Sequence, residues 1–170
     1  NILNQVILIG LVISLFRASG PLLCNARAGK YAVPAFNTSN LEVTQALFAA
    51  AERKRAPLLI QTTESTMAYA GLENLFSLIR AMEKNSRVPV CVHLDHGKDM
   101  RLIKRCIAIG YKSVMGDASR KPFVQNVAVT RRVVRAARAR KCSVEAELGA
   151  LGRLGEAKLT DPSQAKTFVA

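Results

Sequence analysis

The only two histidines of this chain lie in a tetrapeptide that could carry out metal chemistry, His-Leu-Asp-His, from His93 to His96. An imidazole can bind a divalent cation, a neighbouring carboxylate can move a proton, and a second imidazole can orient its neighbours. The tetrapeptide follows a β-branched run, 88–92, and precedes Gly97. This pattern predicts a buried strand that delivers polar side chains to a site at its carboxyl end. A strand end that is followed by a helix N-cap is the alternative interpretation.

Strand-like and helix-like segments alternate along the chain, and they must position this array. Short apolar runs predict strands at 31–36, 57–61, 88–94, 112–115 and 143–147. Helical periodicity and capping residues predict helices at 22–28, 41–54, 72–84, 100–109 and 126–140. Such alternation predicts an α/β fold with parallel strands and right-handed crossovers. A doubly wound open sheet is the competing architecture, but no G-x-G-x-x-G follows the first strand, so a dinucleotide site is not expected.

Polar residues stand at or after the carboxyl end of every predicted strand. They are Asn37, Thr62 to Glu64, His93 to His96, Asp117 with Ser119, and Glu145 with Glu147. Parallel strands bring their carboxyl ends to one edge of a sheet, where α/β proteins bind ligands. The sequence therefore predicts one site at this edge, built from ionisable groups of several strands.

Composition indicates one globular unit and restricts its partners. The 170 residues are 49% hydrophobic and carry 25 Lys and Arg against 12 Asp and Glu, which gives a net charge of +13. The basic residues fall mainly on helical segments, and the chain has no Trp and only three Tyr. We therefore expect a solvated basic surface and no nucleic-acid partner, although this field also suits a small anionic substrate.

The N-terminal segment and the cysteines point to a cytoplasmic protein. The apolar run 6–15 is shorter than the ~20 residues that span a bilayer. We interpret 1–21 as an apolar extension and 22–170 as the domain, with a targeting leader as the alternative. Cys24, Cys91, Cys106 and Cys142 lack C-x-x-C spacing, which favours reduced packing thiols in an intracellular protein.

Four stretches together resemble a known family, the class II, zinc-dependent ketose-bisphosphate aldolases. The stretches are 29–37 (GKYAVPAFN), 93–97 (HLDHG), 113–119 (SVMGDAS) and 143–149 (SVEAELG). The resemblance implies a partial (β/α)8 TIM barrel with about five βα units present. It also implies aldol cleavage of fructose or tagatose 1,6-bisphosphate to dihydroxyacetone phosphate and glyceraldehyde 3-phosphate, with the two substrates left open. In such enzymes Zn²⁺ polarises a carbonyl group and stabilises the enediolate.

The resemblance also implies a role for individual residues. Asp95 resembles the proton donor and acceptor, His96 the first zinc ligand, and Asp117 and Glu147 the carboxylates of a second or alternative metal position. Asn37 and Thr63 match substrate-binding positions, and Glu156 is a candidate base for the ketose half. His93 is expected to support the site or pack rather than to bind metal.

The chain departs from the family at its end and in one strand. It ends at Ala170, whereas a barrel of this kind takes roughly 250 residues, so we expect a C-terminal truncation. The family's two other zinc histidines fall in the absent part, which predicts a weak or lost Zn²⁺ site and impaired cleavage. The alternative is a noncatalytic remnant, or a subunit that pairs with itself or with a full-length aldolase chain. Gly116 replaces a branched residue and is expected to weaken its strand.

Overall fold

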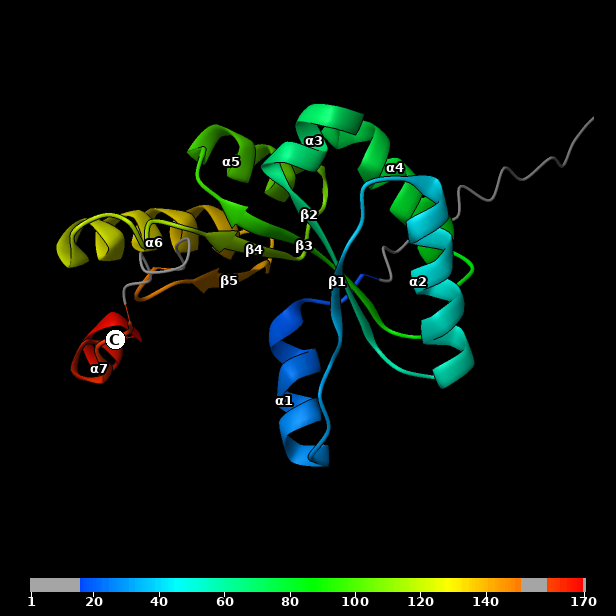
Figure 1. Cartoon of the computed structure of the whole chain (residues 1–170), viewed down its shortest axis with the longest axis horizontal. Helices are drawn as coiled ribbons and strands as arrows, with labels where there is room; N and C mark the ends of the chain where they lie inside the picture. The colour runs from blue at the N-terminus through cyan, green and yellow to red at the C-terminus, as the bar shows by residue number, and fades with distance from the viewer. Residues whose placement is uncertain (1–15, 151–158, 170) are drawn as a thin grey trace, which may run out of the picture.

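The computed structural model describes residues 16–150 and 159–169, and these form a five-stranded parallel sheet flanked by helices (Figure 1). The strands are β1 (Ala35–Asn37), β2 (Leu58–Thr63), β3 (Val90–Gly97), β4 (Ser113–Gly116) and β5 (Ser143–Ala146). The helices are α1 (Ser19–Gly29), α2 (Leu41–Lys54), α3 (Glu64–Ala70), α4 (Leu72–Glu83), α5 (Met100–Ile109), α6 (Phe123–Arg138) and α7 (Pro162–Val169). Strand order follows chain order, and all four neighbouring pairs are parallel. The predicted α/β fold with about five βα units is confirmed.

The two faces of the sheet are covered differently. Alternating residues of the strands, such as Ile60 and Val92, face the main core, into which α2, α4, α5 and α6 also pack. The opposite, concave face carries Leu59 and Cys91, against which Leu22 of α1 is buried. Figure 1 shows α1 below the sheet, α2 to α6 around its other side, and α7 at the lower left beside the C-terminus. The concave face is therefore where side chains from several strands can meet.

Most predicted elements are confirmed, and two helices, α3 and α7, were missed. The helices predicted at 41–54 and 100–109 have those bounds, whereas α6 begins three residues earlier than predicted. The polar segment 62–66, between the strand predicted at 57–61 and the helix predicted at 72–84, contains the end of β2 and the start of α3. Thr63 caps this helix, because its hydroxyl accepts the Thr66 N–H and the Thr66 hydroxyl accepts the Thr63 N–H. Two threonines thus form a capping box that usually requires Glu or Gln at its second position.

The segment that precedes α1 is anchored to the sheet where the structure describes it. Residues 1–15 of the predicted extension lie outside the described residues. Phe16 is 4% exposed, its ring centroid lies 5.8 Å from that of Phe76, and the Arg17 N–H donates to the Val90 carbonyl at 2.8 Å. The domain boundary after residue 21 stays a prediction. Within 16–150 and 159–169, no helix has the length and apolar character to cross a membrane.

Gly116 serves close packing of β4 against α6. A Cβ atom at this position would lie 2.8 Å from Cγ2 of Val133, which is fully buried on α6. The space that a branched residue would fill is thus occupied by Val133. Packing is therefore not left open beside Gly116, and the expected cost to the stability of the strand stays a prediction.

The four free cysteines should differ sharply in reactivity. Cys24 is exposed, whereas burial raises the pKa of Cys91 and of Cys106 to about 12 and that of Cys142 to about 11. Because the thiolate is the reactive form, we expect one thiol to react rapidly with Ellman's reagent near pH 8, and all four after denaturation. Cys24→Ser should remove the rapid phase. Rapid reaction of a second thiol in the native protein would contradict this assignment.

Candidate metal centre

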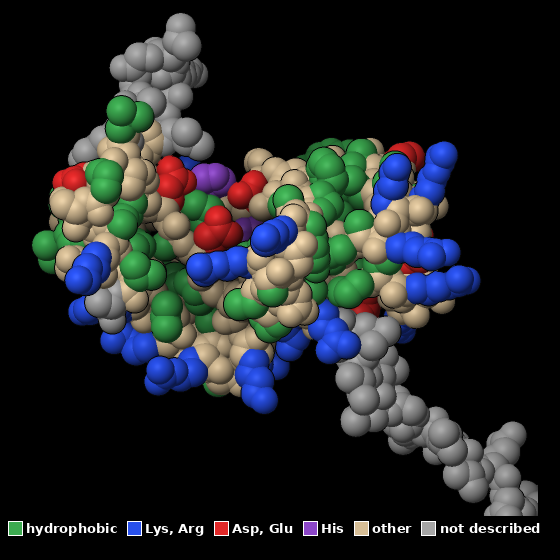
Figure 2. Space-filling model, turned by 90° about the horizontal axis from the view of Figure 1, so that it is seen from below, with side chains coloured by type: hydrophobic (Ala, Val, Ile, Leu, Met, Phe, Trp, Pro, Cys, Tyr) green, Lys and Arg blue, Asp and Glu red, His purple; other side chains and the backbone are tan. Residues whose placement is uncertain are grey.

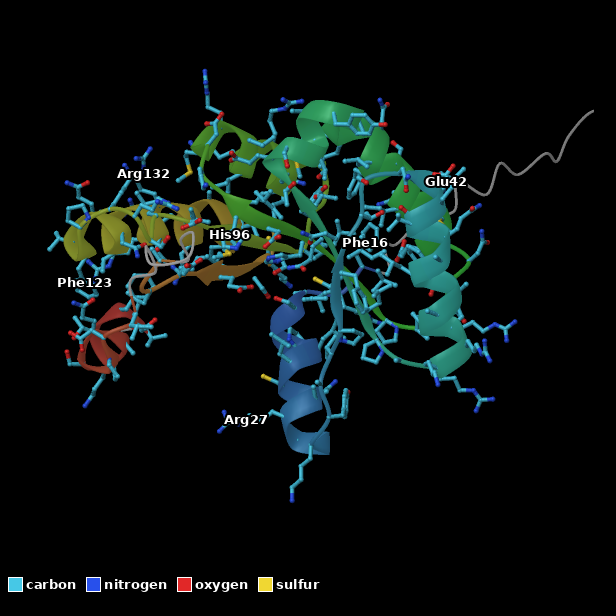
Figure 3. The ribbon with its side chains drawn as sticks, in the orientation of Figure 1. Phe16, Arg27, Glu42, His96, Phe123 and Arg132 are labelled. Atoms are coloured by element: carbon cyan, nitrogen blue, oxygen red, sulfur yellow. The ribbon has the colours of Figure 1, made fainter. Side chains whose placement is uncertain are left out.

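Three side chains from the ends of three adjacent strands form a cluster that could hold a cation. They are His96 at the end of β3, Asp117 after β4 and Glu147 after β5, and each offers a ligand atom within 4.8 Å of the other two. His96 Nδ1 lies 3.0 Å from Asp117 Oδ2 and 3.5 Å from Glu147 Oε2. Figure 3 shows His96 at the end of the sheet from which α5 and α6 start. The predicted meeting of these three residues at one edge is what the structure displays.

A break in the regular pairing of β3 directs His96 toward the carboxylates. Regular alternation would put His96 on the same side as Leu94, which is buried in the helix-covered core. The β3–β4 register shifts between Leu94 and Gly97, and His96 adopts a left-handed backbone with φ of 49°. An irregularity of this kind can turn a side chain from one face of the sheet to the other. His96 therefore contacts Asp95, Asp117 and Glu147 instead of the core.

Hydrogen bonds within the cluster shift the pKa values of His96 and Asp117. The hydrogen bond with Asp117 raises the pKa of His96, although partial burial opposes the shift. Burial alone would raise the pKa of Asp117, but hydrogen bonds from Ser119 and His96 outweigh it and lower the pKa. Asp117 is thus held as an anion. One imidazole among several carboxylates is a surrounding that attracts a cation.

Asp95 lies beside this cluster with its two carboxylate oxygens in different contacts. Asn37 of β1 donates its side-chain N–H to Asp95 Oδ2 at 3.1 Å. Asp95 Oδ1 lies 3.8 Å from His96 Nε2. The Asp95 side chain is 18% exposed, so solutes can reach it. A carboxylate that is oriented on one oxygen and accessible on the other suits proton transfer.

The two remaining predicted site residues have different outcomes. Thr63 pairs with Asp95 in the β2–β3 register, so it lies beside the site. Its hydroxyl, however, contacts Ser65 Oγ at 2.8 Å and caps α3. Glu156 lies outside the described residues.

His93 is buried in the sheet and is not part of the cluster. It is 1% exposed, and its Nδ1 lies 2.7 Å from the Ser113 hydroxyl, which in turn contacts the Ser19 hydroxyl of α1. Burial lowers the pKa of His93 to about 4, so the imidazole is neutral near pH 7. Its Nε2 lies 3.6 Å from Glu145 Oε2, and this contact is not an ion pair while His93 is neutral.

Glu64 was placed at this edge by its position after a predicted strand, but its contacts there were not predicted. Glu64, in the first turn of α3, accepts the backbone N–H groups of Lys98 and Asp99 through Oε1 at 2.7 and 2.8 Å. This fixes the loop that directly follows His96 and Gly97. The contact joins residues 34 positions apart, and no local pattern indicates it.

The donor set fits a divalent cation such as zinc. Zinc–ligand bonds of about 2.0–2.2 Å place two ligand atoms of one tetrahedral ion about 3.3–3.6 Å apart. The imidazole–carboxylate distances of 3.0 and 3.5 Å are near this range. Figure 2 shows acidic side chains next to histidine in the middle of one face, with most Lys and Arg side chains around its periphery.

Comparisons with known proteins agree with one another. Residues 19–170 match the family model "Fructose-bisphosphate aldolase class-II". The chain is 42% identical over 154 residues to the fructose-bisphosphate aldolase of Giardia intestinalis, covering 87% of this chain and 48% of that protein. It is 44% identical over 134 residues to that of Geobacillus stearothermophilus, covering 77% of this chain and 47% of that protein. The chain thus spans about half the length of the curated relatives it matches.

Solved structures show the same likeness. The YdjI aldolase from Escherichia coli K12 superimposes with a TM-score of 0.82 at 30% identity, covering 91% of this chain and 57% of that one. A putative fructose-1,6-bisphosphate aldolase from Coccidioides immitis gives a TM-score of 0.80 at 33% identity, covering 89% and 56%.

Proposed function

Because this chain belongs to the class-II fructose-bisphosphate aldolase family, we propose that it carries the proton-transfer and metal-binding part of a site for aldol cleavage of a ketose bisphosphate. Fructose 1,6-bisphosphate is the proposed substrate, since the relatives are named for it, with the tagatose epimer as the alternative. The observation that carries the proposal is the position of Asp95, which lies 3.8 Å from the His96 imidazole at the edge of the cation-binding cluster.

The proposed metal is Zn²⁺, held by His96, Asp117 and Glu147. When bound, zinc supplies a Lewis acid that draws electron density from a carbonyl group. The two carboxylates lower the net charge of the occupied site. Asp117 is fixed in place by the Ser119 hydroxyl at 2.7 Å and by the Ser119 N–H at 3.0 Å. Such supporting hydrogen bonds orient a ligand before the metal binds.

Asp95 is the proposed proton carrier. In the cleavage direction its carboxylate accepts the proton of the hydroxyl on the carbon next to the bond that breaks. That carbon becomes the aldehyde, and the bonding electron pair moves to the half that holds the ketone. In the condensation direction Asp95 returns the proton to the aldehyde oxygen. Asn37 orients the carboxylate through its 3.1 Å hydrogen bond, and Glu156 is the proposed base for the ketose half.

A chimera tests this role, because the relatives are about twice as long as the matched region. Residues 19–170 would replace the matching segment of the Geobacillus stearothermophilus aldolase, which is 44% identical. We expect zinc-dependent cleavage of fructose 1,6-bisphosphate by the chimera. Asp95→Asn should lower kcat at least about 100-fold, the range of a lost general base, and leave zinc affinity unchanged.

Asp99→Asn is the matched control, since Asp99 is a carboxylate four residues away that caps α5. It should leave kcat within about threefold, because Asn caps a helix about as well as Asp. A folded chimera that binds zinc and yet has no turnover would favour the noncatalytic remnant. Full activity of the Asp95→Asn chimera would exclude Asp95 as the proton carrier.

A further inference from the structure

Helices α5 and α6 together form an outer surface whose charged residues are all basic. Neither Met100–Ile109 nor Phe123–Arg138 contains an Asp or Glu. The two helices pack against each other on the outer side of the sheet (Figure 1). Figure 3 shows Arg132 projecting from α6 away from His96, so this surface is separate from the metal centre.

A continuous groove runs between the two helices, and we name it the α5–α6 groove. It consists of two adjoining hollows of about 340 and 200 Å³ that share Lys104 and Ala136. Its cationic lining is Lys104, Arg132, Arg135 and Arg140, and no carboxylate lines either hollow. The α6 part of this row follows helical spacing, so the cations lie along one side of the helix.

These four cations lack the partners that neighbouring cations have. Arg105 pairs with Glu73 at 2.6 Å and Arg101 with Asp99 at 3.6 Å. Within the part of the chain that the structure describes, the side chains of the four groove cations make no ion pair. Like charges that line one groove repel each other, so their arrangement does not stabilise the fold. It does match an extended anion.

The dimensions and composition of the groove indicate which polyanion fits. On α6, the stretch from Arg132 to the last helical residue, Arg138, rises about 9 Å along the helix axis, and Arg140 follows two residues after the helix ends. A DNA duplex carries one negative charge per about 1.7 Å of its axis, so a row of this length faces several phosphates. No aromatic residue lines the groove, which leaves nothing for bases to stack on. We propose that the α5–α6 groove binds the phosphate backbone of a nucleic-acid duplex without regard to sequence.

The expectation of no nucleic-acid partner rested on the positions of the basic residues in separate helical segments and on the scarcity of aromatic residues. Lys104 and Arg132 are 28 positions apart, so the sequence presents them as two separate basic helices. The packing of α5 on α6 brings them to one groove, and this is the observation on which the inference depends.

Fluorescence anisotropy with a labelled duplex of about 20 base pairs tests the proposal on the full chain of residues 1–170. With four phosphate contacts, the slope of log affinity against log salt should be about −3.6, which is a loss of about 150-fold between about 50 and 200 mM salt. Arg132→Gln, Arg135→Gln and Arg140→Gln combined should reduce the slope to about −0.9 and the loss to about threefold. Glutamine keeps helix propensity, so α6 should persist by circular dichroism.

The combined variant Arg27→Gln, Arg53→Gln and Lys54→Gln is the matched control. These exposed cations lie on α1 and α2, and the change in net charge is the same. The control should keep the slope of the unaltered chain. Equal loss of slope in both variants would attribute binding to net charge and overturn the proposal. Tighter binding of a single strand of equal length, or no duplex binding at low salt, would overturn it as well.

Discussion

Replacing His96 by asparagine should weaken Zn²⁺ binding by more than about 100-fold. His96 supplies the only nitrogen ligand of the cluster, and removal of mere supporting hydrogen bonds already costs 10–100-fold in zinc sites. Asparagine is the suitable replacement, because His96 has φ of 49° and Asn tolerates the left-handed region. Isothermal titration of the apo protein with Zn²⁺ measures the effect directly.

Two further variants make the result specific. Glu147→Gln keeps size and removes a charged ligand, so it should also lose affinity, by about 10-fold or more. Asp99→Asn removes an exposed carboxylate outside the cluster and should leave zinc affinity unchanged. If His96→Asn bound zinc as tightly as the unaltered chain, the ion would be held elsewhere.

The convergence of the site could be predicted from strand ends alone. Polar residues after three parallel strands must meet at one edge, and His96, Asp117 and Glu147 do so. Asn37 and Asp95 lie at the same edge and are joined by a hydrogen bond of 3.1 Å, although the strand ends did not specify this contact. The chemical roles assigned to these residues remain predictions, because they come from the resemblance and not from the geometry.

The orientation of His96 could not be predicted from the sequence. Simple alternation assigns His96 and Asp95 to opposite faces, and only the register shift near Gly97 brings both to the concave side. That shift depends on contacts between β3 and β4, which lie about 20 residues apart along the chain. The hydrogen bonds of Glu64 to the next loop are equally nonlocal. Local patterns contain none of this information.

Gly97 links the stability of the sheet to the geometry of the metal centre. A Cβ atom here would lie 2.7 Å from Leu94 Cδ2, 2.9 Å from the Met115 carbonyl oxygen and 3.0 Å from Ile103 Cγ1. The Met115 oxygen belongs to the backbone of β4, so it cannot rotate away. The Gly97 carbonyl also accepts the Asp117 N–H at 2.8 Å. Any side chain at Gly97 must therefore push β3 and β4 apart at the point where Asp117 is held.

Gly97→Ala should consequently lose stability and zinc affinity together. Overpacking of this kind costs about 2 kcal/mol, which lowers Tm by about 4–8 °C in a chain of this size. Zinc affinity should fall about tenfold or more, because Asp117 is displaced from His96. Thermal unfolding by circular dichroism and zinc titration well below Tm measure the two effects.

Leu75→Ala separates this coupling from general destabilisation. Leu75 is 2% exposed on α4, away from the metal cluster, and its truncation should cost about 2–5 kcal/mol. While this variant is still folded, its zinc affinity should equal that of the unaltered chain. Gly97, the last residue of β3, is the residue whose carbonyl accepts the Asp117 N–H. If the Gly97→Ala protein were less stable but bound zinc as tightly as the unaltered chain, the packing of β3 on β4 would not set the position of Asp117.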